Sequence, residues 1–232
     1  MSLNMQVINN LENIDILKTE FFKNGIVNIN LDTFSHDTLK KIASYFGELL
    51  KITSPTYIKD ENYVQRISEE AILGNTYLPW HRDLTYTPGD YHGTLLAYKE
   101  SDYDTYTEFL DCNKLYDSLT DNEKKYFKEI KITYGVPKKY TAYNKDSVIE
   151  RDLCLQHPVT KQTTLYFSPE TMISSTKPIY QEALLDRGKV FYKKHFWKKG
   201  DILLYDNRRM LHRRPAFKGH RELLRLNFKY EL

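Results

Sequence analysis

Two histidines and one aspartate have the residue types and spacing of a metal site. His81 and Asp83 lie two residues apart in the segment Leu78-Pro79-Trp80-His81-Arg82-Asp83, and His212 follows far along the chain. Two imidazole nitrogens and one carboxylate oxygen can occupy one face of an octahedral ion and leave the opposite positions open, an arrangement that suits Fe(II) and O2. The three residues are therefore predicted to bind Fe(II) and to be catalytic.

The period of a β-strand predicts how His81 and Asp83 could share a site. Residues i and i+2 of an extended segment project from the same face, so both side chains would face one cavity while Arg82 faces away. The bare pattern is weak evidence, because 7 histidines and 31 acidic residues in 232 positions can produce it by chance. A structural histidine or an ordinary surface strand is the alternative interpretation.

A β-rich framework has to bring these residues together. Alternating or apolar runs predict strands at residues 25–30, 63–67, 94–98, 131–134, 163–167, 201–205 and 223–230. Many short strands favour a β-core of barrel or jelly-roll type, in which strands distant in sequence become neighbours. No linker or repeat divides the chain, so residues 1–232 are expected to form a single domain.

Helices are expected to flank this core. Ser35 can cap a helix whose apolar positions recur at helical spacing, namely Leu39, Ile42, Ala43, Phe46, Leu49 and Leu50. A second helix is predicted near Thr120, because Thr120 and Glu123 match a capping box. A third is predicted to start at Pro178, since proline is favoured at the first helical position. The predicted fold class is mainly β with flanking helices.

Composition limits the range of partners. The formal charge of +3 comes from 34 basic and 31 acidic residues that are interspersed along the chain. Such a nearly balanced surface does not indicate binding of nucleic acid or of a membrane. The two cysteines, Cys112 and Cys154, are too few for a disulfide framework and are read as reduced thiols. No run approaches a membrane span, and Met1 to Asn10 lack signal-peptide features, so a cytoplasmic location is expected.

Further motifs occur in order along the chain. They are Gln156-His157-Pro158-Val159, then Trp197-Lys198-Lys199-Gly200-Asp201, then Asp206-Asn207-Arg208-Arg209-Met210-Leu211-His212. With the segment around His81, they make the chain resemble the taurine dioxygenase family of Fe(II)/2-oxoglutarate oxygenases. The resemblance implies a double-stranded β-helix (jelly-roll) fold, with Fe(II), 2-oxoglutarate and O2 as cofactor and cosubstrates.

The resemblance also implies binding residues for 2-oxoglutarate. Members use an arginine some ten residues past the distal histidine to hold the far carboxylate of the cosubstrate. Arg221 corresponds best to it, and Arg225 to an arginine that in some members binds an anionic group of the substrate, although the two roles could be reversed. Thr105 lies where members carry a threonine whose hydroxyl contacts the same carboxylate. The chain departs from the family at Asp102 and Tyr103, where two glycines are expected, and Arg213 stands where a glycine often follows the distal histidine.

Supporting roles are expected for other residues near the motifs. Asp206 and Asn207 should hold the strand that enters His212, and His157 is expected to be structural. His36, His92 and His195 have no second candidate ligand at a sequence separation that would indicate a metal site. The aromatic residues beside the motifs are expected to pack in the core, because aromatic side chains dominate cores in general. They are Trp80, Tyr86 and Tyr205.

The implied reaction is oxidation of an unactivated C–H bond of a small, polar or anionic molecule, with release of succinate and CO2. The carboxylate of Asp83 favours hydroxylation, desaturation or ring formation, because related halogenases have a small residue at this position. Two alternatives remain open: a non-catalytic jelly-roll binding protein, and an iron oxygenase that does not use 2-oxoglutarate. The substrate and the oligomeric state cannot be read from the sequence, since specificity would come from loops such as 51–77 and 134–155.

Overall fold

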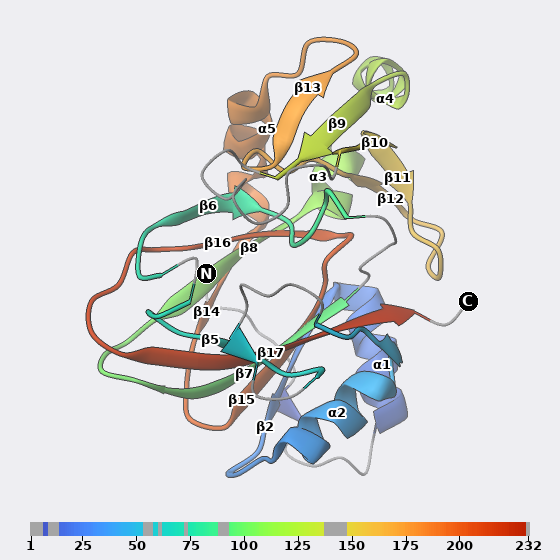
Figure 1. Ribbon diagram of the computed structural model, residues 1–232. Helices are drawn as coiled ribbons and strands as arrows, with labels where there is room; N and C mark the ends of the chain where they lie inside the picture. Colours follow the sequence, from blue (N-terminus) through green and yellow to red (C-terminus); the bar gives the residue numbers. More distant parts are fainter. Residues whose placement is uncertain are drawn as a thin grey trace.

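The computed structural model describes residues 7–8, 14–52, 58–59, 62–71, 74–87, 93–136 and 148–230. Within them, two large sheets face each other (Figure 1). The larger sheet contains, in spatial order, β1 (Val7–Ile8), β2 (Ile26–Asn30), β15 (Asp201–Asp206), β7 (Gly93–Ser101), β17 (Arg221–Tyr230), β5 (Gln65–Ile67) and β4 (Ile58–Lys59), with β3 (Gly47–Leu49) also on β17. The smaller sheet contains β14 (Tyr192–Phe196), β8 (Tyr106–Asp111), β16 (Met210–Arg214) and β6 (Leu78–His81).

Apolar side chains from both sheets meet between them, as a jelly roll requires. Because side chains alternate along each strand, the inward positions of the larger sheet form a contiguous buried cluster with Phe109 and Met210 of the smaller sheet. The larger sheet contributes Ile26, Leu96, Leu203, Tyr205 and Leu223. The predicted mainly-β jelly roll is confirmed.

Two N-terminal helices cover the outer face of the larger sheet (Figure 1). Helix α1 (Ile14–Asn24) buries Leu17 and Phe21, and α2 (His36–Ser44) buries Leu39, Ile42 and Ala43. Ser35 caps α2 as predicted, since its side chain accepts a hydrogen bond from the backbone N–H of Thr38. These helices supply the second apolar layer that buries the outward face of β7, β15 and β17.

Helix α2 is shorter than its apolar stripe predicted. It ends at Ser44, and the expected helical positions Leu49 and Leu50 lie in and directly after β3, where Leu49 pairs with Phe228 of β17. A Cβ at Gly47 would lie 1.9 Å from the backbone oxygen of Lys229, so only glycine permits this close pairing. Tertiary pairing with β17 therefore overrides the local helical periodicity.

An insert made of helices and two small sheets lies beyond the smaller sheet of the jelly roll (Figure 1). Its helices are α3 (Cys112–Asp117), α4 (Asp121–Lys128), α5 (Gln181–Gly188) and the 3-10 turn η2 (Lys189–Phe191). Its strands are β9 (Lys131–Gly135), β10 (Val148–Asp152), β11 (Cys154–Gln156), β12 (Thr163–Leu165) and β13 (Met172–Ser175).

Two of the helix predictions fall in this insert. The capping box of Thr120 and Glu123 is present at the start of α4, as predicted. The prediction that a helix starts at Pro178 is wrong by three residues, because the backbone oxygen of Pro178 accepts a hydrogen bond from Tyr126 and α5 begins only at Gln181. Cys112 and Cys154 are free thiols, as predicted. No helix of the described residues has the length and apolar character needed to span a membrane.

Candidate metal centre

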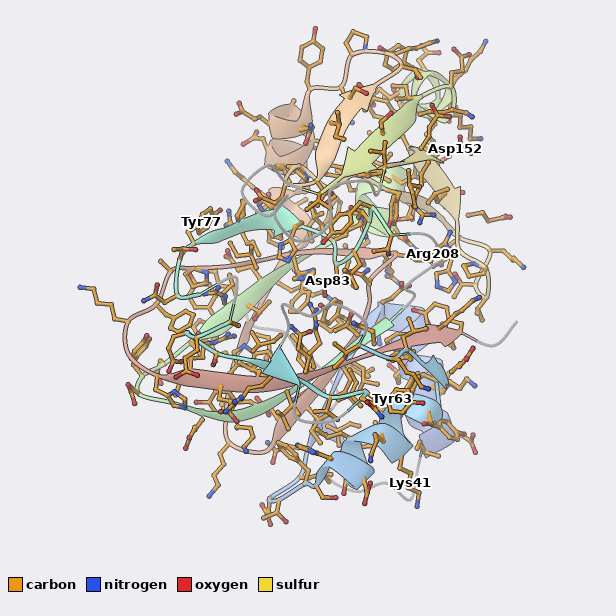
Figure 2. All side chains as sticks on the ribbon, in the orientation of Figure 1. Lys41, Tyr63, Tyr77, Asp83, Asp152 and Arg208 are labelled. Carbon is orange, nitrogen blue, oxygen red and sulfur yellow. The ribbon has the colours of Figure 1, made fainter. Side chains whose placement is uncertain are left out.

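Strand pairing brings His81 and His212 together in space. Strand β16 lies between β8 and β6, and His212 pairs directly with His81 across the ladder. The ring centroids of the two histidines are 4.1 Å apart. Asp83 follows His81 in the turn after β6, and one candidate ligand atom from each of the three residues lies within 4.8 Å of the others. Figure 2 shows Asp83 in the space between the two sheets.

The carboxylate of Asp83 lies opposite both imidazoles. Its Oδ1 atom is 3.8 Å from Nε2 of His81 and 3.8 Å from Nε2 of His212. All three side chains are buried. Two imidazole nitrogens and one carboxylate oxygen on one side of a cavity form the donor set of a facial Fe(II) site. The sequence prediction that these three residues converge agrees with the structure.

The backbone conformation at Asp83 differs from the prediction. Strand β6 ends at His81, and Asp83 lies in a turn whose next residue, Leu84, has a φ of +56°. The two side chains therefore do not share a strand face. The turn is held by Asn207, which accepts a hydrogen bond from the N–H of Asp83 (3.0 Å) and donates one to its backbone oxygen (3.0 Å).

Arg82 faces away from the pocket, as predicted, but it is not a surface residue. Its side chain is 1% exposed and lies inside the protein below the turn. The guanidinium donates hydrogen bonds to four backbone oxygens, those of Leu165, Phe167, Asn207 and Arg208. Arg82 thus ties the turn between the two candidate ligands to the insert and to the segment before His212.

Neighbouring groups orient the candidate ligand atoms. The Nδ1 atom of His81 lies 2.8 Å from the backbone oxygen of Pro79, which can only accept, so Nδ1 carries the proton and Nε2 faces Asp83. The hydroxyl of Tyr205 donates to Oδ2 of Asp83 at 3.0 Å, which directs Oδ1 toward the histidines. Tyr205 does lie in the core, as predicted, but its contact with Asp83 was not foreseen. Such hydrogen bonds to ligands are a common requirement of metal sites.

The protonation states suit metal binding. Burial lowers the pKa of His81 and lowers that of His212 well below the ordinary value, with His81 adding to the effect on His212. Both rings are therefore neutral, the form that binds a metal. Burial alone would raise the pKa of Asp83, but the charge of Arg225 is the largest opposing effect, and the pKa is lowered to about 2. Asp83 is consequently an anion at neutral pH.

The segment before His212 is anchored by Asp206, as expected. Oδ1 of Asp206 accepts the backbone N–H groups of Arg208 and Arg209, at 2.8 and 3.2 Å. Its Oδ2 lies 3.0 Å from Nε2 of His157. His157 accepts two backbone N–H groups on its Nδ1, so its Nε2 carries the proton and lies next to the carboxylate of Asp206. This arrangement gives His157 a structural role.

A pocket of about 490 Å³, its open mouth included, adjoins the three candidate ligands. The pocket contains Arg221 and Arg225, as predicted from their spacing of four on one strand, together with several residues that were not predicted. The lining residues are Ile67, Leu78, His81, Asp83, Leu96, Thr107, Tyr205, His212, Arg214, Arg221, Leu223 and Arg225.

Thr105 lies directly before β8 and is buried, but it is not among the described residues that line this pocket. Thr107, two residues further on, does line it. The hydroxyl of Thr107 accepts a hydrogen bond from Nε1 of Trp197 (3.1 Å). The hydroxyl of Thr105 has no hydrogen-bond partner among the described residues.

The two predicted arginines have different surroundings. The Nη1 atom of Arg225 is 3.3 Å from Oδ1 of Asp83, and its Nε donates to Oε1 of Gln65 at 2.9 Å. Arg221 is 3% exposed, and its Nε has no partner in the described structure. Burial and the charge of Arg214 lower the pKa of Arg221 to about 9. Arg225 thus has an acidic partner, whereas Arg221 lies buried beside another cation.

Sequence reasoning missed several polar contributors to the site, Thr107 among them. Arg214 could have been found, because it lies two residues after His212 and hence on the same face of a strand. Gln65 and Tyr205 carry no such signal, since each belongs to a strand that meets the site only through sheet pairing. His92 lies outside the described residues, and His195 is 3.1 Å from Asp201, away from the pocket lining.

Comparisons with known proteins agree with this geometry. Residues 17–227 match the model of the taurine catabolism dioxygenase TauD, TfdA family. A comparison with curated proteins gives no significant match.

Solved structures share the fold. A protein from Burkholderia xenovorans assigned as an α-ketoglutarate-dependent taurine dioxygenase is 19% identical with a TM-score of 0.81, covering 100% of this chain and 92% of its own. A taurine dioxygenase from the same organism is 18% identical with a TM-score of 0.76, covering 100% of this chain and 84% of its own. AAD-2, solved with Mn(II) and N-oxalylglycine, is 17% identical with a TM-score of 0.78, covering 100% of this chain and 99% of its own.

The family match spans most of the chain, and members of the family are dioxygenases that use Fe(II), α-ketoglutarate (2-oxoglutarate) and O2. The matching fold and the convergent His81, Asp83 and His212 agree with it. The protein belongs to the TauD/TfdA family and is an Fe(II)- and 2-oxoglutarate-dependent dioxygenase.

Proposed function

We propose that the protein hydroxylates an unactivated C–H bond of a small polar or anionic molecule, and that residues 1–232 form one catalytic domain. His81, Asp83 and His212 would hold Fe(II), which supplies the O2-dependent oxidation that couples conversion of 2-oxoglutarate to succinate and CO2 with oxidation of the substrate. The donor set, the neutral imidazoles and the ionised Asp83 support this assignment.

The observation that carries the use of 2-oxoglutarate is the buried Nε of Arg221, which has no partner in the described structure. A buried cation without a counter-charge is costly, and a bound carboxylate would supply both the charge and the hydrogen-bond acceptors. The hydroxyl of Thr105 is likewise buried and unpartnered. We assign both residues to the far carboxylate of 2-oxoglutarate.

Arg225 is assigned to an anionic group bound close to the iron. Its guanidinium faces Oδ1 of Asp83, the oxygen that also lies opposite the two histidines. When that oxygen binds a cation, the charge of Arg225 loses part of its compensation, and an anionic substrate group can restore it. Gln65 accepts from Nε of Arg225 and so fixes the direction in which the guanidinium points.

The rest of the pocket supports an oxidation that excludes water. Its apolar lining comes from Ile67, Leu78, Leu96 and Leu223, which would surround the target carbon. The carboxylate at Asp83 occupies the position that a halide needs in related halogenases, and this favours hydroxylation, desaturation or ring formation.

Succinate release from 2-oxoglutarate, with Fe(II) and O2 but without prime substrate, tests the use of the cosubstrate. Slow, iron-dependent release is expected, and a screen of small carboxylic, sulfonic and amino acids should then reveal compounds that stimulate it. Product analysis by mass spectrometry would show a gain of one oxygen atom for hydroxylation or a loss of two hydrogens for desaturation. Absence of succinate under all conditions would favour a binding protein or an oxygenase that uses no 2-oxoglutarate.

Two arginine variants test the division of roles. Arg221→Ala should raise the apparent requirement for 2-oxoglutarate by roughly tenfold or more, the factor that corresponds to about 1.5–3 kcal/mol for a hydrogen bond to a charged group. Arg225→Ala should instead weaken binding of the stimulating substrate. If only Arg225→Ala changes the requirement for 2-oxoglutarate, the two roles are reversed.

A further inference from the structure

The backbone that leads into Arg221 is held by acidic side chains to which the proposed function gives no role. Arg221 is the first residue of β17 and pairs with Ser101, the last residue of β7. Its side chain is buried in the pocket, whereas the preceding residue, His220, has a side chain that is 36% exposed. The direction in which the Arg221 side chain enters the pocket therefore depends on how the backbone of these two residues is fixed.

Glu69 continues the pairing of β17 beyond the end of β5. Strand β5 ends at Ile67, which pairs with Leu223. Two residues further on, Oε2 of Glu69 accepts the backbone N–H of Arg221 at 3.2 Å, and Oε1 accepts from Nδ1 of His220 at 2.8 Å. The hydrogen bond from His220 is the largest cause that lowers the pKa of Glu69 to about 2, so Glu69 is an anion at neutral pH. One carboxylate thus holds both the backbone of Arg221 and the ring before it.

Asp102 holds the same segment from the other neighbouring strand. Its Oδ2 accepts the backbone N–H of His220 at 2.6 Å, and its own N–H donates to the backbone oxygen of His220 at 3.0 Å. Gly219 has a φ of +72°, and a Cβ at this position would collide with the Asp102 carboxylate. Asp102 stands where the family pattern has a glycine, which could make only the backbone contact. The aspartate therefore adds a side-chain contact at this position.

Glu100 also contacts His220 but lies farther out. Its Oε1 is 3.2 Å from Nε2 of His220, the ring nitrogen opposite the one that bonds to Glu69, and its side chain is 70% exposed. Exposed ion pairs contribute little to stability. Glu100 is consequently a reference for the effect of an acid beside His220 that does not hold the backbone of β17.

We propose that Glu69 and Asp102 are positioning residues, which fix the backbone of His220 and Arg221 so that the Arg221 guanidinium meets the far carboxylate of 2-oxoglutarate. The inference rests on the proposed function, in which Arg221 binds that carboxylate. A guanidinium contacts a carboxylate best when its planar fork is aligned with both oxygens. Loss of either acid would shift the start of β17 and weaken this alignment, although neither acid touches the ligand.

A pair of ligands isolates this role. 2-Oxoglutarate and 2-oxopentanoate share the keto acid end that would bind the metal, but 2-oxopentanoate has no far carboxylate. Their dissociation constants would be measured by calorimetry under anaerobic conditions with Mn(II), so that no turnover is needed. Glu69→Ala and Asp102→Ala should each weaken 2-oxoglutarate by about three- to tenfold, the factor of one hydrogen bond, and change 2-oxopentanoate by less than about twofold.

Glu100→Ala is the matched control, and it should change both dissociation constants by less than about twofold. Asp102→Asn should restore binding of 2-oxoglutarate, because the amide oxygen can still accept the N–H of His220. Thermal unfolding would confirm that each variant is folded. Glu69→Gln, which keeps one of the two oxygen acceptors, and Asp102→Gly provide further variants if the alanine variants do not fold.

A double-mutant cycle tests whether Glu69 acts through Arg221. In the background of Arg221→Ala, the change Glu69→Ala should have little further effect on binding of 2-oxoglutarate, because the group that Glu69 positions is gone. Full additivity of the two changes would show that Glu69 acts by another route. The same cycle applies to Asp102.

The outcomes separate this inference from the proposed function. For each acid, equal weakening of both ligands would indicate a merely structural role, and unchanged binding of 2-oxoglutarate would remove the acid from the mechanism. A loss of the same size in Glu100→Ala, or additivity with Arg221→Ala, would also overturn the inference. If the wild-type protein with Mn(II) binds no 2-oxoglutarate, the proposed function itself fails. Binding that depends on Arg221 but on neither acid rejects the positioning role alone.

Discussion

At the scale of single residues, the candidate ligands are oriented by hydrogen bonds that they make outside the metal face. His81 is fixed through the backbone oxygen of Pro79, and Asp83 through the hydroxyl of Tyr205 and the amide of Asn207. These partners do not supply ligand atoms. They should nevertheless change the affinity for the metal, because they fix the orientation of the side chains that do.

Removal of a candidate ligand should abolish metal binding without unfolding the protein. His81→Ala and Asp83→Ala are expected to lose Fe(II)-dependent turnover, because each leaves only two of three ligand atoms in a preformed barrel. Thermal unfolding gives an independent readout: Mn(II) at 100 times its dissociation constant should stabilise the wild type by about 2.7 kcal/mol and the variants not at all. Unchanged turnover and unchanged stabilisation in both variants would refute the site.

The hydroxyl of Tyr205 should matter for metal affinity. Tyr205→Phe removes the hydrogen bond to Oδ2 of Asp83 while keeping the ring in the core, and it should weaken Mn(II) binding by roughly 10- to 100-fold. Metal titration followed by calorimetry would measure this loss. Tyr134→Phe is the control, since that buried hydroxyl bonds to the backbone of Tyr166 in the insert. Equal affinity in the two variants would show that Tyr205 does not orient Asp83.

At the scale of elements, strand pairing explains why the site forms. The short strand β6 has its last residue, His81, beside His212 of β16, and Phe109 of β8 lies on the other side of His212. Arg82 follows β6 directly, and its guanidinium bonds to backbone oxygens of the insert and of the turn that precedes β16. The metal centre and the insert are therefore mechanically linked by one side chain.

Arg82→Met should destabilise the fold by at least about 3 kcal/mol, since it leaves four buried carbonyl groups without a charged donor. Urea unfolding of the metal-free protein would measure the effect without interference from metal binding. The matched substitution Arg66→Met concerns a partly exposed arginine paired with Glu222 at 3.9 Å, and it should cost less than about 1 kcal/mol. A comparable loss in both variants would contradict the structural role of Arg82.

The elements also show what the sequence could predict. The cap at Ser35, the capping box at Thr120 and the strand at 201–205 depend on local residue types, and the structure agrees with them. The end of α2 and the position of Asp83 in a turn depend on distant partners, Lys229 and Asn207, that local patterns cannot specify. The metal triad was predictable because its motif is short and ordered, whereas Gln65 and Tyr205 enter the site through pairing alone.

At the scale of the whole molecule, buried titratable groups predict how stability depends on pH. The folded protein lowers the pKa values of His81 and His212 by burial and lowers that of Asp206 despite burial, with His157 as the main favourable partner. The unfolded chain titrates at the ordinary values, about 6.5 for histidine and 3.9 for aspartate. It therefore binds more protons than the folded chain in acid, and stability must fall as the pH falls.

Urea unfolding of the metal-free protein should consequently show decreasing stability below about pH 6.5, as unfolded histidines gain protons, and a further decrease below about pH 4. His212→Gln should reduce the slope of the first decrease, because one buried neutral imidazole is removed. Constant stability between pH 7.5 and pH 5.5 would contradict the burial of neutral histidines. The same protons compete with a metal, so stabilisation by Mn(II) should also decline in acid.

Under the proposed function, the metal ligands of the smaller sheet and Arg221 on β17 of the larger sheet hold the two ends of the cosubstrate. The separation of the two sheets cannot adjust to the ligand. A keto diacid one carbon shorter than 2-oxoglutarate would leave one end unbound, and one carbon longer would have to buckle. Oxaloacetate and 2-oxoadipate should thus be poor replacements, because the length of the cosubstrate is measured by the gap between two facing sheets.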